Sequence, residues 1–342
     1  MNIEIIRLNQ NSYDEKKYED FLMEAYGPQL FNHKKERFLW YKQNTEYCVY
    51  LAVMNHKIVA QSCGYKVNAI INNKKYPLWW SIDTIALEEC RGKGIGKMLQ
   101  KKLSDECENF SSAFYSKING IIKRKCGGEP LFPIKFIYYP VSNYVSYCTE
   151  LIIKKIAKKD IHLPLGISYF YSNLNAFTTP KYTFIESSFT TQNIDFINKV
   201  LAKNYDFYIE RNESFIKWKY ENNPSITHHL FEVYQKKDLV AIVICTDIYK
   251  TSYLQRPIYA VKLLDVFSID PKKFTTKYAL HIIVDYYKKQ GKYLDGILSI
   301  HNCNYFPRLV YPKTSVLSTF RKQNITNPYL SYNDQDMEQM LE

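Results

Sequence analysis

The chain has 342 residues, about twice the roughly 150 of a typical domain, so a single small domain is excluded. Hydrophobic residues make up 46% and charged residues 23%, and Gly (11) and Pro (13) are sparse, which excludes a disordered or collagen-like chain. The formal charge of +12 indicates either an anionic partner or simple solubility, and the basic residues are too dispersed to predict nucleic-acid binding.

The cysteines and the apolar runs predict where the protein works. The eight cysteines lie far apart without a C-x-x-C pair, so we expect neither a metal site nor a disulfide framework. The longest apolar run, 239–245, is far shorter than the roughly 20 residues that cross a bilayer. The opening segment, 1–8, alternates as a strand does and carries Glu4, unlike a signal peptide. We therefore expect a cytoplasmic protein without a membrane span.

Hydrophobic periodicity predicts a mixed α/β order in the first half of the chain. In chain order, the predicted elements are a strand over 1–8, helices over 11–26 and 34–44, strands over 48–53, 57–71 and 76–87, a helix over 94–109, a strand over 110–115, a helix over 118–125 and a strand over 131–139. Short turns at 55–56 and 72–74 predict that the three central strands form an antiparallel meander.

Three short matches in the same order predict that the second half repeats the first. The matching residues are Trp40 and Trp218 at an offset of 178, Val59 and Val240 at 181, and Asp83 and Asp265 at 182. We therefore predict an α/β (α+β) protein of two mixed-sheet units in tandem, each a mostly antiparallel sheet flanked by helices. The predicted boundaries are a first domain over 1–150, a connector over 151–189 and a second domain over 190–335.

A glycine-rich segment between a predicted strand and a predicted helix carries the clearest chemical signal. It runs Arg91-Gly92-Lys93-Gly94-Ile95-Gly96-Lys97. Glycines allow a sharp turn, and the free N–H groups and dipole of the following helix favour an anion. Neither G-x-G-x-x-G nor G-x-x-x-x-G-K-[ST] occurs there. The pattern predicts a phosphate site, and the alternative is a turn that binds nothing.

This string resembles the [RQ]-x-x-G-x-[GA] pyrophosphate loop of the GNAT superfamily of acyl-CoA-dependent N-acyltransferases. The resemblance covers about residues 1–140 and implies two GNAT-like units with acetyl-CoA as acyl donor. The implied pyrophosphate contacts are Arg91, Gly92, Lys93, Gly94, Ile95, Gly96 and Lys97, and the implied main-chain contacts to the pantetheine arm are Ile85, Ala86 and Leu87. The family often has Val-x-Pro where this chain has Ala86-Leu87-Glu88.

The second copy departs further from the family. Residues 273–278 stand in place of the loop, and all three glycines are replaced. Bulky side chains there would block a pyrophosphate, so we predict one cofactor site in each chain. The second copy resembles the degenerate domains of tandem members, which complete the acceptor pocket or form a homodimer.

The resemblance also implies candidate catalytic residues. Some sugar-acetylating members have an acid at the place of Asp83, which we consider as a base; the alternative is a structural carboxylate, which the echo at Asp265 favours. The family's thiolate acid is a Tyr within a pattern resembling Tyr-x-x-x-Gly-Phe, but residues 123–128 here contain no Tyr. Tyr115 is the candidate substitute. Cys90 has no His near it in the sequence, and the family transfers its acyl group directly.

The expected function is transfer of an acetyl group to the primary amine of a small acceptor, such as an amino sugar or a nucleotide-linked amino sugar. Three alternatives stay open. They are acylation of a protein or peptide amine, a CoA-binding module without catalysis, and a tRNA-dependent transfer that uses the positive charge. The sequence identifies neither the acceptor nor the acyl chain length.

Overall fold

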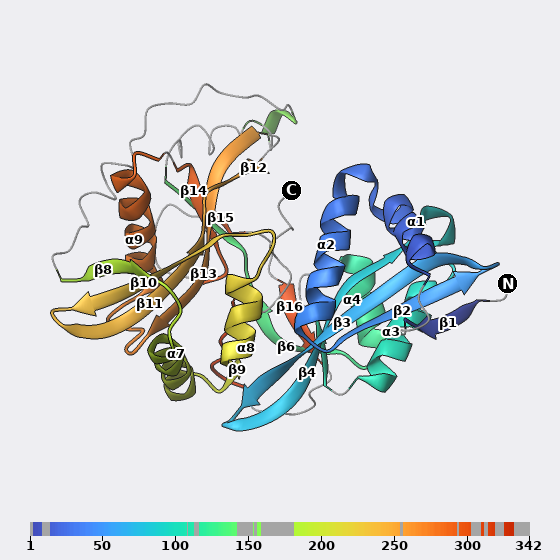
Figure 1. Ribbon diagram of the computed structural model, residues 1–342, viewed down its shortest axis with the longest axis horizontal. Helices are drawn as coiled ribbons and strands as arrows, with labels where there is room; N and C mark the ends of the chain where they lie inside the picture. Colours follow the sequence, from blue (N-terminus) through green and yellow to red (C-terminus); the bar gives the residue numbers. More distant parts are fainter. Residues whose placement is uncertain are drawn as a thin grey trace. The chain divides into compact units, whose positions relative to one another are not determined.

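The computed structural model describes residues 3–8, 14–107, 109–112, 116–141, 153, 156–158, 181–253, 256–292, 294–301, 309–310, 314–318 and 325–331. The chain divides into two compact units, and each unit is built from three separate stretches of the sequence (Figure 1). The first unit comprises Met1–Ile134, Tyr205–Ser225 and Thr314–Leu330, and the second comprises Lys135–Asn204, Ile226–Lys313 and Ser331–Glu342.

The first unit is built on an eight-stranded sheet of order β1-β2-β3-β4-β5-β16-β6, with β9 paired to β3. The strands are β1 (Glu4–Arg7), β2 (Tyr47–Met54), β3 (Lys57–Ile71), β4 (Lys74–Ala86), β5 (Phe110–Ser112), β6 (Glu129–Ile134), β9 (Phe207–Ile209) and β16 (Thr314–Ser318). Neighbouring strands pair antiparallel except β4 and β5, which run parallel. The parallel pair follows from the helix that connects these two strands.

Helices cover both faces of this sheet. They are α1 (Glu15–Tyr26), α2 (Pro28–Asn44), α3 (Ile95–Glu106), α4 (Lys117–Lys125), α8 (Glu213–Ile216) and the π-helical turn η2 (Lys217–Glu221). Tyr18 of α1 donates a hydrogen bond to Gln61, whereas Gln100 of α3 donates to Ser62. Because successive strand residues point to opposite faces, α1 and α3 lie on opposite sides of β3.

The second unit has its own eight-stranded sheet, of order β15-β7-β14-β13-β11-β10-β8, with β12 paired to β13. The strands are β7 (Ile137–Pro140), β8 (Thr183–Ser187), β10 (His228–Gln235), β11 (Asp238–Thr246), β12 (Tyr249–Tyr253), β13 (Arg256–Ser268), β14 (Gly296–Ser299) and β15 (Leu309–Val310). Its helices include α7 (Thr191–Asn204) and α9 (Thr276–Lys289).

The two sheets share one connectivity. In each, two antiparallel pairs lead to a long strand, a helix follows, and the next strand pairs parallel to the long strand. In the first unit the long strand, helix and parallel strand are β4, α3 and β5, and in the second they are β13, α9 and β14. The predicted fold class, mixed sheets flanked by helices, is therefore confirmed.

Most predicted elements of the first half are present, with three differences. The single strand predicted over 131–139 is two strands, because β6 pairs with β16 in the first unit while β7 pairs with β14 in the second. The second helix begins at Pro28 rather than residue 34, since proline is favoured in a first helical turn. The predicted strand over 110–115 is described only to Ser112.

The two units do not follow contiguous stretches of sequence. The chain passes from the first unit to the second between Ile134 and Lys135, and residues 205–225 and 314–330 return to the first unit. Most of the predicted connector over 151–189 lies outside the described residues, although its end includes β8. The predicted boundaries 1–150, 151–189 and 190–335 stay a prediction for the folding domains.

None of the helices in the described ranges is long and apolar enough to cross a membrane.

Candidate active site

The glycine-rich loop leaves β4 and enters α3. After β4 ends at Ala86, a short 3-10 turn over Glu88–Cys90 leads to Gly92 and Gly94, whose φ angles are 78° and 80°. These left-handed conformations favour glycine, and a Cβ atom at either position would meet no atom within 4 Å. The loop therefore turns sharply while leaving open space next to its backbone.

Buried residues on both sides hold the loop in place, although its tip is exposed. Arg91, Gly92, Lys93 and Gly94 are exposed, whereas Cys90 before them and Ile95 after them are each 1% exposed. The Nε atom of Arg91 donates a hydrogen bond of 3.3 Å to the carbonyl of Ala86. The turn is thus held by two buried anchors and by its own arginine.

The residues of the loop fit a pyrophosphate group. Gly94 is the N-cap of α3 and provides no side-chain cap, so the first N–H groups of the helix face outwards without an intrahelical partner. Arg91, Lys93 and Lys97 add exposed positive charge around these donors. Exposed donors, cationic side chains and open space beside two glycines match the chemistry of a diphosphate.

Next to the loop, β4 extends beyond its described pairing with β5, and the end of this pairing is called the fork below. The two strands pair only through Trp79 with Phe110 and Trp80 with Ser111, and β5 ends one residue later. Strand β4 continues to Ala86 while paired with β3 on its other edge. Its edge towards β5 is therefore unpaired beyond Trp80 among the described strands, and an extended chain can add to this edge by main-chain hydrogen bonds.

A β-bulge lies in the same part of β4. Gln61 of β3 opposes Ile85 and Cys63 opposes Ile82, so the two residues Asp83 and Thr84 face the single residue between them. Asp83 has a φ of 44°, a left-handed conformation that is uncommon for a residue other than glycine. The bulge therefore kinks β4 beyond its last described pair with β5, Trp80 with Ser111.

The carboxylate of Asp83 points towards α2. Its Oδ1 atom lies 2.8 Å from Nζ of Lys34, and both side chains are largely buried. Burial raises the pKa of Asp83, but the positive charges of Lys34 and Arg37 outweigh it and bring the pKa down to about 2. Asp83 is therefore ionised at neutral pH.

A polar cluster lies on the α3 side of the bulge. The Nε2 atom of Gln100 donates hydrogen bonds to the hydroxyls of Ser62 at 2.6 Å and Thr84 at 2.7 Å, and lies 3.4 Å from that of Ser81. Gln100 is fully buried. Since Gln100 belongs to the helix that starts at the loop, it connects the loop to the kinked strand.

Helix α4 brings a buried lysine to the same region. The Nζ atom of Lys123 donates a hydrogen bond to the hydroxyl of Ser112 at the end of β5, and the residue is 3% exposed. Burial lowers the pKa of Lys123 to about 7. Ile122 belongs to α4, and a Cβ atom built on Gly96 of α3 would lie 3.5 Å from its side chain. Helix α4 therefore packs directly beside the loop.

In the second unit, the corresponding turn has a different character. Helix α9 begins after Thr275, and Phe274, in the turn before it, is 2% exposed and part of the core. No glycine occurs between Asp270 and the helix. A buried phenylalanine and the missing glycines leave this turn without the features that fit a diphosphate.

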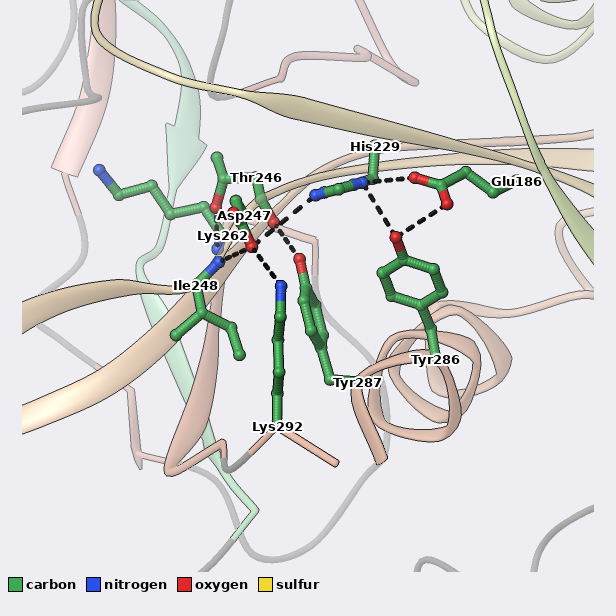
Figure 2. A network of polar contacts seen from close by, with 9 residues as sticks. All are labelled: Glu186, His229, Thr246, Asp247, Ile248, Lys262, Tyr286, Tyr287 and Lys292. Atoms are coloured by element: carbon green, nitrogen blue, oxygen red, sulfur yellow. Dashed lines mark hydrogen bonds and ion pairs between the residues drawn. The ribbon is translucent and has the colours of Figure 1, made fainter. Parts of the chain in front are cut away.

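The second unit contains a polar network around His229, shown in Figure 2. The Nδ1 atom of His229 lies 2.5 Å from Glu186 Oε1 and 3.3 Å from the hydroxyl of Tyr286, which also donates to Glu186. On the other side of the ring, Nε2 lies 3.8 Å from Asp247, and Lys292 lies 3.6 Å from the same carboxylate. The network joins β8, β10 and α9.

In the described part of the chain, no group of three or more His, Cys, Asp or Glu side chains is arranged to hold a metal ion.

Residues 15–118 match the sequence model of the Acetyltransferase (GNAT) family. The matched segment runs from α1 to α4 and includes the loop, the fork and the bulge. This part of the chain is therefore similar to the GNAT acetyltransferases. No curated protein matches the sequence.

Several solved structures share the fold over nearly the whole chain. A GCN5-related N-acetyltransferase from Anabaena variabilis is 8% identical with a TM-score of 0.57, over 93% of this chain and 72% of that one. A probable N-acyltransferase from Enterococcus faecalis is 11% identical with a TM-score of 0.58, over the same shares. A glucosamine N-acetyltransferase region of a fungal multi-domain β-N-acetylglucosaminidase is 10% identical with a TM-score of 0.57, over 93% of this chain and 38% of that one.

The structure gathers most of the predicted site residues around one fork. Asp83, the segment Ile85–Leu87 and the loop Arg91–Lys97 follow one another from the bulge to α3. Tyr115 lies outside the described residues. Sequence reasoning missed Lys34, Gln100 and Lys123. Gln100, a polar residue between the apolar Leu99 and Leu103 in an amphipathic helix, carried a signal in the sequence. Lys123 did so too, because it is the first residue of the stretch 123–128 that was compared with the family's Tyr-x-x-x-Gly-Phe pattern.

Proposed function

We propose that the protein transfers an acetyl group from acetyl-CoA to the primary amine of a small cytoplasmic acceptor, and that the acceptor is an amino sugar or a nucleotide-linked amino sugar. The observation that carries the proposal is the loop of Gly92 and Gly94 directly beside the unpaired edge of β4. One feature fits a diphosphate and the other fits the extended pantetheine arm, and CoA contains both.

Each part of the site has a defined role in this proposal. Arg91, Lys93, Lys97 and the N–H groups at the start of α3 hold the diphosphate, and the main chain of Ile85, Ala86 and Leu87 pairs with the arm. The acetyl carbonyl then lies at the fork, next to the bulge. Backbone N–H groups at a kinked strand are suitable donors to a developing oxyanion.

Asp83 has an electrostatic role in the proposal. With a pKa of about 2 it is a weak proton acceptor, so it attracts and orients an acceptor ammonium group rather than removing its proton. The proton leaves to water before the amine attacks. Tyr115, the other predicted catalytic residue, stays a prediction.

An amino sugar acceptor is supported by two observations. The ion pair of Lys34 with Asp83 offers a donor and an acceptor of hydrogen bonds together, which suits a substrate with hydroxyl and ammonium groups. One protein with a similar fold is described as a glucosamine N-acetyltransferase region.

We further propose that the second unit is a degenerate GNAT-like copy. The shared strand order supports this reading, as do the bulges in β4 near Asp83 and in β13 near Asp265. Catalysis would then belong to the first domain, predicted over 1–150, and the second domain, predicted over 190–335, would have no cofactor site of its own.

The proposal is tested by calorimetric titration of the purified chain with acetyl-CoA. We expect one molecule bound per chain, with binding abolished by Gly94→Trp, whose side chain fills the space beside the loop. Gly291→Ala is the matched control, because Gly291 also has a positive φ, 69°, with nothing near its Cβ position, but lies at the end of α9. Release of free thiol with glucosamine then tests the acceptor. Absence of acetyl-CoA binding by the unaltered chain would overturn the proposal.

A further inference from the structure

Lys123 is an unusual residue for the position it occupies. Its neighbours Arg124 and Lys125 in the last turn of α4 are exposed, as lysines and arginines normally are. Lys123 itself is 3% exposed, so its amine lies inside the first unit. Burying a lysine has a large desolvation cost, and a buried lysine next to a ligand site is a candidate for a chemical role.

The side chain of Lys123 reaches the end of β5. Its Nζ atom donates a hydrogen bond to the Ser112 hydroxyl and lies 5.9 Å from the centre of the Phe110 ring. Phe110 and Ser112 are two residues apart on one strand, so both point to the same face of the sheet. Lys123 therefore lies on the face of β5 that α3 and α4 cover.

This position is the fork between β4 and β5. Phe110 is paired with Trp79, and Ser112 is the first residue beyond the last paired position. On β4, Ser81 points to the same face as Trp79 and is approached by Gln100 of α3. The amine of Lys123 thus faces the fork from the β5 side, as Gln100 does from the β4 side.

The same helix borders the cofactor loop. Ile122, next to Lys123, is the residue closest to a Cβ atom built on Gly96. Lys97, Lys101 and Asp105 of α3 act electrostatically on the Cys126 thiol, which follows α4. The pKa of Lys123, about 7, is lowered by burial. Its protonated and neutral forms are therefore both populated near neutral pH.

We propose that Lys123 is the catalytic acid that protonates the departing thiolate of CoA. The proposal rests on the function proposed above, in which the thioester lies at this fork. An acyl transfer to an amine must supply a proton to the sulfur, and Tyr115, which the sequence suggested for this step, lies outside the described residues.

The step balances as follows. The acceptor nitrogen forms a bond to the carbonyl carbon, and the bond between this carbon and sulfur breaks with its electron pair on the sulfur. The ammonium group of Lys123 gives a proton to the sulfur and becomes a neutral amine. The nitrogen of the new amide gives its extra proton to water, and Lys123 takes a proton back from water. An acid with a pKa near the working pH suits both the donation and the return.

The test uses the full chain and two variants of one helix. Lys123→Met removes the amine with little change in volume, and Lys125→Met is the matched control on the exposed side. The first readout is proton exchange on acetyl-CoA binding, measured by calorimetry in two buffers of different ionisation enthalpy. The second is the pH profile of kcat for free-thiol release with glucosamine. Thermal unfolding confirms that each variant is folded.

We expect the unaltered chain to exchange a fraction of a proton on binding near neutral pH, because a ligand at the fork changes the surroundings of Lys123. This exchange should be smaller in Lys123→Met, where only the phosphomonoester of CoA still contributes, and should be unchanged in Lys125→Met. In turnover, kcat should fall about 100-fold in Lys123→Met with its acetyl-CoA affinity retained, and the fall in rate at high pH should disappear. Lys123→Arg should keep that rate at higher pH, since arginine stays protonated.

Different results identify which idea fails. If the unaltered chain does not bind acetyl-CoA, the proposed function is wrong and the role of Lys123 with it. If acetyl-CoA binds but Lys123→Met shows the same proton exchange as the unaltered chain, only the role of Lys123 is overturned. The same holds if kcat and its pH profile are unchanged in this variant.

Discussion

The Nζ atom of Lys34 lies 2.8 Å from a carboxylate oxygen of Asp83, so helix α2 is tied by an ion pair to the bulge in β4. Asp83 holds a left-handed backbone conformation there, which is unfavourable for a side chain with a Cβ atom. The ion pair stabilises the bulge from one face, and the bonds of Gln100 stabilise it from the other. The kink at the fork is therefore fixed before any ligand arrives.

Lys34→Met should destabilise the protein in a way that depends on pH. At neutral pH the variant leaves a largely buried carboxylate without this partner, and we expect a loss of about 2–4 kcal/mol in the free energy of unfolding. The pKa of Asp83 in the folded protein is below its ordinary value, so the ion pair contributes stability above 3.8 and loses it as the pH falls towards about 2. The difference between variant and unaltered chain should therefore narrow in acid.

Urea unfolding at neutral pH and at the lowest pH that the native state tolerates measures this difference. Lys17→Met is the control, because the ion pair of Lys17 with Asp14 is exposed and contributes little. A loss in Lys34→Met that stays constant with pH would show that the destabilisation comes from packing and not from the ion pair.

Asp83→Asn tests the electrostatic role in turnover. We expect kcat/KM for glucosamine to fall by about 10- to 100-fold, because the amide no longer attracts the acceptor ammonium group. The affinity for acetyl-CoA should be retained, because the side chain of Asp83 points towards α2 and is not part of the loop that binds the diphosphate. If Asp83 were instead a base that titrates near neutral pH, the unaltered chain would show an acid limb in its pH profile that Asp83→Asn lacks.

The local parts of the fold were predictable from the sequence, whereas the exchange of segments was not. The meander of β2, β3 and β4 and the turn into α3 follow from alternation, tight turns and glycines that act over a few residues. Strands β16 and β9 join the first sheet from far along the chain, and nothing in their short sequences specifies a partner. The sequence also gives no sign of the break between Ile134 and Ile137, because the strands on both sides of it are rich in apolar residues.

Some residues of the candidate site could also be predicted from the sequence, whereas others could not. Loop residues such as Gly92 and Gly94 carry their function in their own backbone conformation, so a motif reveals them. Lys34 and Lys123 matter because tertiary packing buries them beside Asp83 and Ser112, and among 46 Lys and Arg residues a sequence does not show which are buried. Trp40 and Trp218, which the predicted repeat assigned to separate copies, both belong to the first unit, where their ring centres lie 5.5 Å apart.

Trp218→Ala should destabilise the first unit. The ring of Trp218 packs against Trp40 at 5.5 Å, Tyr41 at 5.7 Å and Tyr65 at 5.4 Å between ring centres, and the residue is 4% exposed. Removing a buried Trp side chain usually costs about 3–5 kcal/mol. Because α2 and β3 also support the bulge, we expect acetyl-CoA binding to weaken as the unit becomes partly unfolded.

Thermal unfolding with and without acetyl-CoA measures this effect, with Trp218→Phe as a milder variant that keeps an aromatic ring. Saturating acetyl-CoA should restore part of the lost stability, since a ligand that binds only the folded state stabilises it. Unchanged unfolding in Trp218→Ala would contradict the assignment of residues 205–225 to the first unit.

His229→Ala should destabilise the second unit alone. The imidazole bonds to Glu186 and Tyr286 and packs edge-on against Tyr287, so its loss releases contacts between β10, β8 and α9 (Figure 2). We expect about 1–3 kcal/mol, because Glu186 is 44% exposed and regains water. Lys292→Met is the control, since that lysine is half exposed and its pair with Asp247 is long. Hydrogen exchange of β8, β10 and α9 should increase while acetyl-CoA affinity stays unchanged, and a loss of affinity would place part of the cofactor's support in the second unit.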